Sequence, residues 1–217
     1  MKKLFFILLA SMIAFTGVAQ ITHTAQGNVD KHAQEILKKA SSAFSSKPVS
    51  CIVTMVSRDA HKKESARQDV QVLYHKGKYH ITSHDQELYC DGTSVWHWQK
   101  EVNEVVVSKM VQSDDDLMNP GRLLMNYSKN FRPKYIRTEE DGTAIVDLQP
   151  IKSKSYHKIR LFITEKTGVI KRMEMHNYDG SQGEFHVANF RVGAKCADKD
   201  FIFDRATHKG VEVIDMR

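Results

Sequence analysis

The chain has 217 residues, and its 32 basic and 26 acidic residues give a formal net charge of +6. Because the basic residues are spread along the chain without a dense tract, nucleic-acid binding is not expected. This spread fits an ordinary solvated surface, and weak attraction to anionic membranes or acidic partners is the alternative. The length suits one domain with a substantial core.

The N-terminal segment has the three parts of a secretory signal peptide. Lys2 and Lys3 precede an apolar run at residues 4–15, and small residues follow at 17–19. The apolar run is too short for a membrane-spanning helix, which needs about 20 residues; an uncleaved anchor is the alternative. We expect a signal peptide over residues 1–19, cleavage after Ala19, export to the periplasm, and one mature domain over residues 20–217.

Three cysteines lie beyond the predicted signal peptide, at Cys51, Cys90 and Cys196. An oxidising compartment would permit one disulfide and leave one thiol over. All three lie in or beside apolar strand-like runs, so buried structural thiols are the alternative. The sequence does not indicate a pairing.

The first element expected in the mature chain is an amphipathic helix with Asp30 as its N-cap. Its apolar residues recur at helical spacing and form one stripe. These residues are Ala33, Ile36, Leu37, Ala40 and Phe44. Pro48 follows the last of them and ends the helix.

Strand patterns come next, at residues 49–57, 67–75 and 79–83. Residues 88–107 then hold two strand-like runs joined at Asp91-Gly92, a favoured hairpin turn, and a third run that completes a meander. In this meander Trp96 and Trp98 share one face of their strand, while Val95 and His97 share the other. A face with two indoles needs a cover, which is either protein or an apolar ligand.

After a polar break at residues 112–119, Asn119 and Pro120 predict the start of a second helix that carries Leu123, Leu124 and Tyr127. Strand patterns return at residues 135–138, 143–149, 157–164, 169–176 and 182–192, and strand-like apolar runs close the chain at 201–203 and 211–214. The pattern predicts an α+β fold. We expect a single large curved antiparallel sheet of about ten strands, an incomplete β-barrel covered by the N-terminal and the central helix.

The sequence contains few recognisable patterns of catalytic residues. The chain has no GxSxG, HExxH, GxGxxG or Walker-type motif. Its eleven histidines include His75, His80 and His84 in neighbouring strand patterns, but they lack zinc-ligand spacing. A thiol nucleophile at Cys90 would need a base that the sequence does not mark. We expect no enzyme activity, no cofactor and no metal.

Large apolar side chains are more numerous than one packed layer obviously needs. Met173 and Met175 alternate within one strand pattern, and flexible methionines often serve surfaces that accept varied apolar ligands. Aromatic and methionine stripes also occur as ordinary core. Periodicity leaves both interpretations open.

Three motifs in a fixed order link the chain to a known family. They are DGTSVW and NEVVV within residues 91–107, NPGRLL at residues 119–124, and FIF with KGVEVID within residues 201–215. In this order they resemble the hairpins, central lid helix and C-terminal ending of the periplasmic outer-membrane lipoprotein carrier family, the LolA-like proteins. Two departures stand out: His80 lies where the family has a lid-holding arginine, and His208-Lys209 replaces a proline before the final glycine.

The resemblance implies a monomeric carrier whose apolar cavity, between sheet and helices, shields the acyl chains of lipoproteins. Its partners would be acylated lipoproteins, an inner-membrane lipoprotein-releasing transporter and an outer-membrane receptor. His80 is the candidate for the lid latch. An envelope lipid- or lipoprotein-binding sensor that regulates a membrane partner is the alternative function. The residues expected to line the cavity are Trp96, Trp98, Met173, Met175, Leu123, Leu124 and Phe44.

Overall fold

The computed structural model describes residues 30–45, 47–111 and 120–217. The predicted signal peptide, the polar break at 112–119 and the cap residue Asn119 lie outside the described residues. Two α-helices and twelve strands are described. Their bounds are α2 Lys31–Ser45, β1 Val49–Arg58, β2 Glu64–His75, β3 Lys78–Thr82, β4 Gln86–Cys90, β5 Ser94–Gln99, β6 Glu104–Lys109, α3 Pro120–Asn130, β7 Phe131–Thr138, β8 Thr143–Pro150, β9 Tyr156–Thr164, β10 Ile170–Asn177, β11 Gln182–Val192 and β12 Glu212–Asp215.

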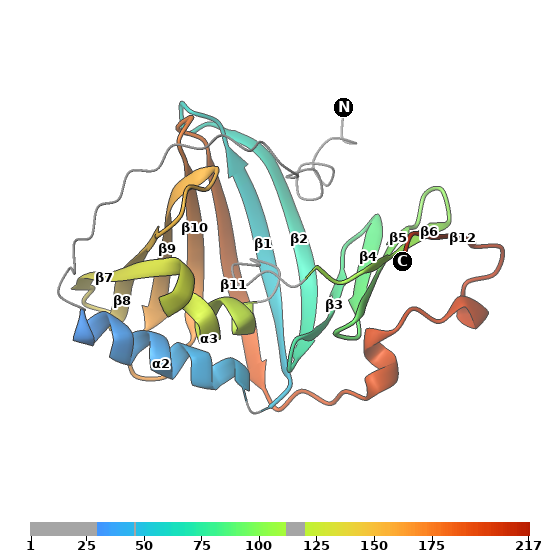
Figure 1. Ribbon diagram of the computed structural model, residues 1–217, viewed down its shortest axis with the longest axis horizontal. Coiled ribbons are helices and arrows are strands. Elements are labelled where there is room, and N and C mark those ends of the chain that lie inside the picture. Colours follow the sequence, from blue (N-terminus) through green and yellow to red (C-terminus); the bar gives the residue numbers. More distant parts are fainter. Residues whose placement is uncertain (1–29, 46, 112–119) are drawn as a thin grey trace.

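All twelve strands form one sheet in the order β12-β6-β5-β4-β3-β2-β1-β11-β10-β9-β8-β7. Every neighbouring pair is antiparallel except β12 and β6, which are parallel. The sheet is curved and open, with β12 and β7 as its edges, and both helices lie against its concave side (Figure 1). The predicted α+β fold with an incomplete barrel is confirmed.

Helix α2 begins and packs as its sequence predicts. The Asp30 carboxylate accepts hydrogen bonds from the backbone N–H of Ala33 at 3.0 Å and from that of Tyr135 at 2.7 Å. The bond from Ala33, followed by that from Tyr135, lowers the pKa of Asp30 despite partial desolvation. The same carboxylate therefore caps α2 and ties its start to β7. The predicted apolar stripe is buried.

The middle of α2 rests on the hairpin between β9 and β10. Gly168 in this turn has a φ of +74°, and a Cβ atom there would lie only 2.5 Å from the carbonyl carbon of Lys39. The Lys39 ammonium donates a hydrogen bond of 3.2 Å to the carbonyl oxygen of Glu165. Glycine thus serves both the turn and the close approach of the helix backbone.

We call the face of the sheet beneath α2 and α3 the inner face, and the opposite one the outer face. Strand alternation places a continuous apolar surface on the inner face, packed with both helices into the main core. On the outer face of β8 to β11 and β1, charged residues pair across strands. Arg160 holds Asp147 with two bonds of 2.7 and 2.9 Å, and Arg58 holds Glu184 at 2.5 Å.

Over β3 to β6 the outer face is covered by the C-terminal segment, residues 193–217. Phe201 is fully buried and Phe203 nearly so. The prediction of a strand at residues 201–203 is wrong, because a 3-10 helix at Asp198–Phe201 turns the chain onto the outer face. The second predicted run does form a strand, β12, which joins β6 at the edge of the sheet.

Candidate functional site

The inner face is the most extensive apolar surface that the structure describes. The helices bury Leu123, Leu124 and Phe44 against it, at 2%, 1% and 7% exposure. The Phe44 ring meets Tyr74 and Phe190 edge-on, with centroids 5.9 and 5.6 Å apart. Three of the seven predicted lining residues thus belong to the contact between helices and sheet.

Part of the inner face is less completely buried than the contact beneath the helices. Met173 and Met175 on β10 pack against the main core but stay half-buried. Met173 stands opposite Phe185 and Met175 opposite Gly183 on β11. Other apolar side chains on this face are half-buried as well, namely those of Val53, Val72, Leu88, Val95, Phe185 and Phe190.

Gly183 shapes the middle of this half-buried surface. A Cβ atom at Gly183 would lie 3.7 Å from the Phe185 ring and 3.8 Å from the Met175 methyl group. Without that Cβ, the ends of Phe185 and Met175 lie above bare backbone and keep room to adjust. Sequence reasoning missed Gly183 and Phe185, although their alternation with Gln182 and Glu184 would have placed both on one face.

Trp96 and Trp98 do not join these residues. Trp96 stands opposite Tyr89 and Val107, and Trp98 opposite Glu87 and Val105, all on the outer face. Val95, on the other side of β5, packs against the main core instead. The structure therefore separates the two tryptophans from the other five predicted lining residues by the thickness of the sheet.

The tryptophans belong to an outer aromatic cluster, which consists of Tyr89, Trp96, Trp98, Val105, Phe203 and Val211. Phe203 lies 5.8 Å from Tyr89 and 5.9 Å from Trp98, and His208 lies 4.2 Å from Trp98, measured between ring centroids. The Trp98 indole N–H donates a hydrogen bond of 3.3 Å to Asn103. The protein's own C-terminal segment thus packs on the two indoles and leaves them half-buried.

His80 also lies on the outer face, because its neighbours Tyr79 and Ile81 point into the main core. Its Nε2 is 2.9 Å from Glu87 Oε2, and its ring stacks on Tyr89 at 4.1 Å. All of its described contacts are with strand residues. The arrangement therefore does not support a latch between His80 and α2 or α3, since alternation turns the imidazole away from both helices.

Glu87 is the centre of the polar contacts around His80. Burial raises its pKa, but hydrogen bonds from Lys100, Tyr89 and His80 outweigh this and lower the pKa to about 2. The Lys100 ammonium lies 2.8 Å from Oε1, and the Tyr89 hydroxyl donates to Oε2 at 2.5 Å. Desolvation and the bond to Glu87 raise the pKa of Tyr89 in turn. The carboxylate is held charged as a structural group.

The metal-ligating and thiol side chains are the remaining candidates for chemistry. Within residues 30–45, 47–111 and 120–217, no three His, Cys, Asp or Glu side chains come together as metal ligands. All three cysteines are free thiols. Burial raises the pKa of Cys51 to about 11, and Cys90 is fully buried, so both thiols are poor nucleophiles. None of the described helices is long and apolar enough to span a membrane.

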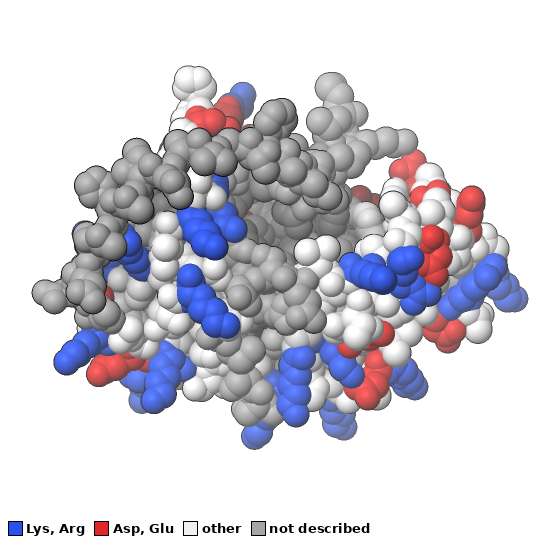
Figure 2. Space-filling model, viewed as in Figure 1, with Lys and Arg blue, Asp and Glu red and all other residues white. Residues whose placement is uncertain are grey.

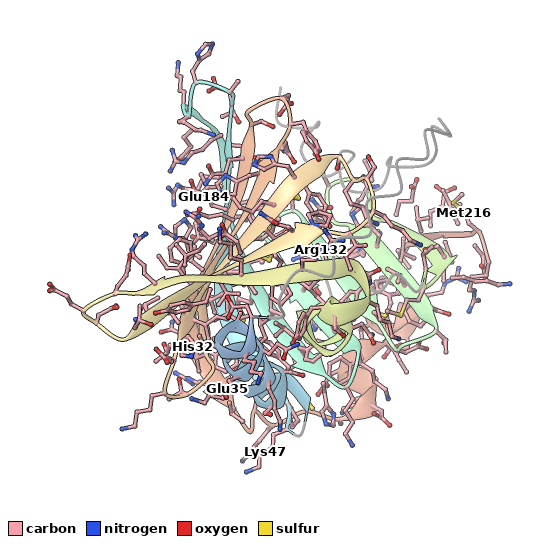
Figure 3. The ribbon with its side chains drawn as sticks, turned by 60° about the vertical axis from the view of Figure 1, so that its left-hand side comes forward. His32, Glu35, Lys47, Arg132, Glu184 and Met216 are labelled. Atoms are coloured by element: carbon pink, nitrogen blue, oxygen red, sulfur yellow. The ribbon has the colours of Figure 1, made fainter. Side chains whose placement is uncertain are left out.

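Basic and acidic side chains are interspersed on the side of the molecule that carries the helices (Figure 2). In Figure 3, His32 and Glu35 lie on α2, whereas Glu184 lies up among the strands and Met216 at the far edge of the sheet. The helix side thus has the mixed charge of a solvated surface, as the spread of charges along the sequence indicates.

Comparison with known proteins gives a family for this arrangement. The family model described as outer membrane lipoprotein carrier protein LolA matches residues 75–204, more than half of the chain. No curated protein sequence matches the chain. An uncharacterized conserved protein from Thermus thermophilus is 14% identical with a TM-score of 0.58, over 85% of this chain and 99% of that one, and shares the fold.

Two further solved structures are similar at lower TM-scores. A LolA superfamily protein from Nitrosomonas europaea is 15% identical with a TM-score of 0.44, over 80% of this chain and 98% of that one. The MucA/MucB complex structure from Pseudomonas aeruginosa contains a chain that is 12% identical with a TM-score of 0.43, over 80% of this chain and 61% of that one.

Proposed function

Because the chain belongs to the outer membrane lipoprotein carrier protein family, LolA, we propose that it carries lipoproteins across the periplasm from the inner to the outer membrane. The acyl chains of the cargo bind to the inner face of the sheet. The observation that carries this proposal is the half-buried apolar surface around Met173, Met175 and Phe185, beside the part of the sheet that the helices bury.

The energetics favour such a surface over a few specific contacts. Each CH₂ group removed from water contributes about 0.8 kcal/mol, so a carrier in water must offer apolar area along the whole acyl chain. Flexible methionines accept chains of varied length and position. The Met175 methyl group lies next to Gly183, where no Cβ atom limits its position.

Helix α3 is the proposed lid. Leu123 and Leu124 attach it to the main core, and its described neighbours are α2 and β7. Uptake and release then require that α3 gives up part of this packing in exchange for contact between acyl chains and sheet. Trp96 and Trp98 are left out of the proposed lining, because the C-terminal segment already covers them.

The proposed cycle places the mature chain, residues 20–217, in the periplasm as a monomer. It takes acylated lipoproteins from an inner-membrane releasing transporter and passes them to an outer-membrane receptor. The ionic and thiol groups of the molecule take no part, so neither cofactor nor covalent intermediate is involved.

Native mass spectrometry of the protein purified from the periplasm tests the proposal. We expect co-purified acylated lipoprotein, and we expect Met175→Glu to lose it, because a carboxylate on the inner face would have to be buried with the acyl chains. The matched control is Ile202→Glu, at 41% exposure in the C-terminal segment on the outer face. The same change of chemistry there should leave cargo binding intact.

Two results would overturn the carrier. One is a protein that never takes up lipid, and the other is equal cargo loss in Met175→Glu and Ile202→Glu. Lipid uptake without transfer of lipoprotein to outer-membrane vesicles would favour the alternative function, an envelope sensor that regulates a membrane partner.

A further inference from the structure

The outer face has a hollow on the opposite side of the sheet from the inner face, and His80 separates it from the outer aromatic cluster. Its volume is about 440 Å³, within the range of small-molecule sites. It spans β11, β1, β2 and β3. We call it the outer hollow, and its lining residues include Ser50, Ile52, Gln71, Leu73, His80, Thr82, Asn189 and Arg191.

Cross-strand register arranges these residues in two rows. In one row Arg191, Ser50, Leu73 and His80 stand side by side on successive strands. In the other, Ile52 stands opposite Gln71 and Gln71 opposite Thr82. Ile52 and Leu73 thus form an apolar floor, and polar side chains surround it.

Four of the surrounding polar side chains are unpaired. The side chains of Ser50, Gln71, Asn189 and Arg191 make no hydrogen bond or ion pair with any described residue, and those of Gln71, Asn189 and Arg191 are exposed to solvent. In the adjoining charged part of the outer face, Arg58, Arg160 and other basic residues are paired with carboxylates. Hydroxyl, amide and guanidinium groups therefore converge on the hollow with their bonding capacity unused.

A β-bulge adds to this convergence. Ser50 pairs with Arg191 and Ile52 with Ala188, so Asn189 and Phe190 together oppose the single residue Cys51. Asn189 adopts a φ of +53°, a left-handed conformation that asparagine tolerates better than most residues. Phe190 packs inward on Phe44, whereas Asn189 lines the hollow. Bulges of this kind re-aim side chains at functional sites.

The lining has a definite charge preference. Arg191 is its one formally charged side chain, and the nearest carboxylate beside His80, Glu87, is already held by Lys100. Asp69, two residues before Gln71, is bonded to the Thr54 hydroxyl. A guanidinium at one end favours an anionic group, and the amides and hydroxyls favour neighbouring alcohol groups.

We propose that the outer hollow binds a small hydroxylated ligand with one anionic group. This chemistry is shared by the headgroup of phosphatidylglycerol and by free glycerol phosphate. Arg191 contacts the phosphate, Asn189, Gln71 and Ser50 contact the hydroxyl groups, and Ile52 and Leu73 lie beneath the carbon backbone. The site is on the opposite face from the proposed acyl-chain surface and does not depend on it.

Nuclear magnetic resonance titration with sn-glycerol 3-phosphate tests the site. We expect shifts at the side-chain amides of Asn189 and Gln71, and binding about tenfold weaker in Arg191→Gln, the loss expected for one charge-assisted contact. Arg132→Gln is the matched control, because Arg132 is another exposed arginine without a described partner, on β7 at the edge of the sheet (Figure 3). It should bind as the parent protein does.

Two further experiments distinguish a lipid headgroup from a free ligand, and this proposal from the carrier proposal. Binding to vesicles of phosphatidylglycerol, but not phosphatidylcholine, that is lost in Arg191→Gln supports a lipid headgroup as the source; a response to glycerol phosphate alone supports the free ligand. No response to either probe, or equal affinity in Arg191→Gln and the parent, would overturn the site. Met175→Glu should bind glycerol phosphate normally, so failure of the carrier proposal and failure of this one are distinguishable.

Discussion

The inner and outer faces of the sheet are both covered over part of their area, but by different elements. Two amphipathic helices cover the inner face and leave a half-buried apolar margin around Met173 and Met175. The C-terminal segment covers the outer face over β3 to β6. There it packs against Trp96 and Trp98, and the ring of Phe203 contacts the ring of Trp98. The inner cover thus leaves an apolar margin with flexible methionines, whereas the outer cover buries Tyr89, Phe203 and Val211 in a second, aromatic core and leaves the two indoles half-buried.

The largest expected effect in this comparison is loss of the outer cover. Phe203→Ala should lower the free energy of unfolding by about 3–5 kcal/mol, because it removes a nearly buried ring from the outer aromatic cluster. Chemical denaturation measures this loss. Uptake of an apolar dye by the folded variant should be unchanged, since the dye binds on the inner face.

Leu124→Ala provides the matched variant for the inner cover. It should cost about 2–5 kcal/mol and, unlike Phe203→Ala, change dye uptake, because Leu124 attaches the proposed lid to the core. If Phe203→Ala abolished dye uptake and Leu124→Ala did not, the outer aromatic cluster would be the binding surface and the comparison would be reversed.

The second prediction concerns pH and the polar contacts beside the outer cluster. The folded-state pKa of Glu87, about 2, lies below its ordinary value of 4.5. The stability that the charged carboxylate contributes is therefore fully present above about pH 4.5 and is lost as the pH falls towards 2. The difference corresponds to at most about 3 kcal/mol. Glu87→Gln should remove this part of the acid dependence, measured by denaturation at several pH values.

Asp141→Asn is the control for Glu87. The pKa of Asp141 is also lowered to about 2, first by its hydrogen bond with Lys171, but the group is fully exposed. Solvent screening makes its contribution to stability much smaller. An equal change in acid dependence for both variants would show that the contacts of Glu87 with Lys100, Tyr89 and His80 have no special weight.

Local patterns in the sequence account for most of the fold. The stripe from Ala33 to Phe44 predicts α2, because 3.6-residue periodicity leaves little choice of buried face. The side on which β5 meets the main core was not predictable in this way. Val95 and the pair Trp96 and Trp98 offer apolar groups on both faces, so alternation does not assign them.

What decides the faces of β5 is a contact distant in sequence. Phe203 covers Trp98 from more than one hundred residues away, and a 3-10 helix, rather than the expected strand, brings it there. The face on which His80 lies was not predictable from the local pattern either, since it depends on which side of β3 meets the main core. The outer hollow was equally beyond local patterns, because its lining comes from four strands that meet only in the folded sheet.

The third prediction tests how tightly helix α2 packs against the turn at Gly168. Gly168→Ala and Gly142→Ala both place a side chain at a positive φ, of +74° and +75°, at a cost of about 1–2 kcal/mol each. Only at Gly168 would the new Cβ also meet the backbone of α2, so that variant should lose a further 1–3 kcal/mol, roughly the cost of overpacking. Equal losses in thermal denaturation would mean that α2 moves aside freely.

The smallest expected effect is on the reactivity of the thiols, which reports whether either cover opens in the folded protein. At pH 8 iodoacetamide should label Cys196 first, because it lies partly exposed in the C-terminal segment, although burial and then Asp200 and Asp198 raise its pKa. Cys51, whose pKa burial raises to about 11, should react far more slowly, and fully buried Cys90 only when the sheet unfolds. Mass spectrometry of timed samples gives the three rates. If Cys90 were labelled as fast as Cys196, β4 would open without global unfolding, and the contrast between a firmly packed outer cluster and an adaptable inner surface would not hold.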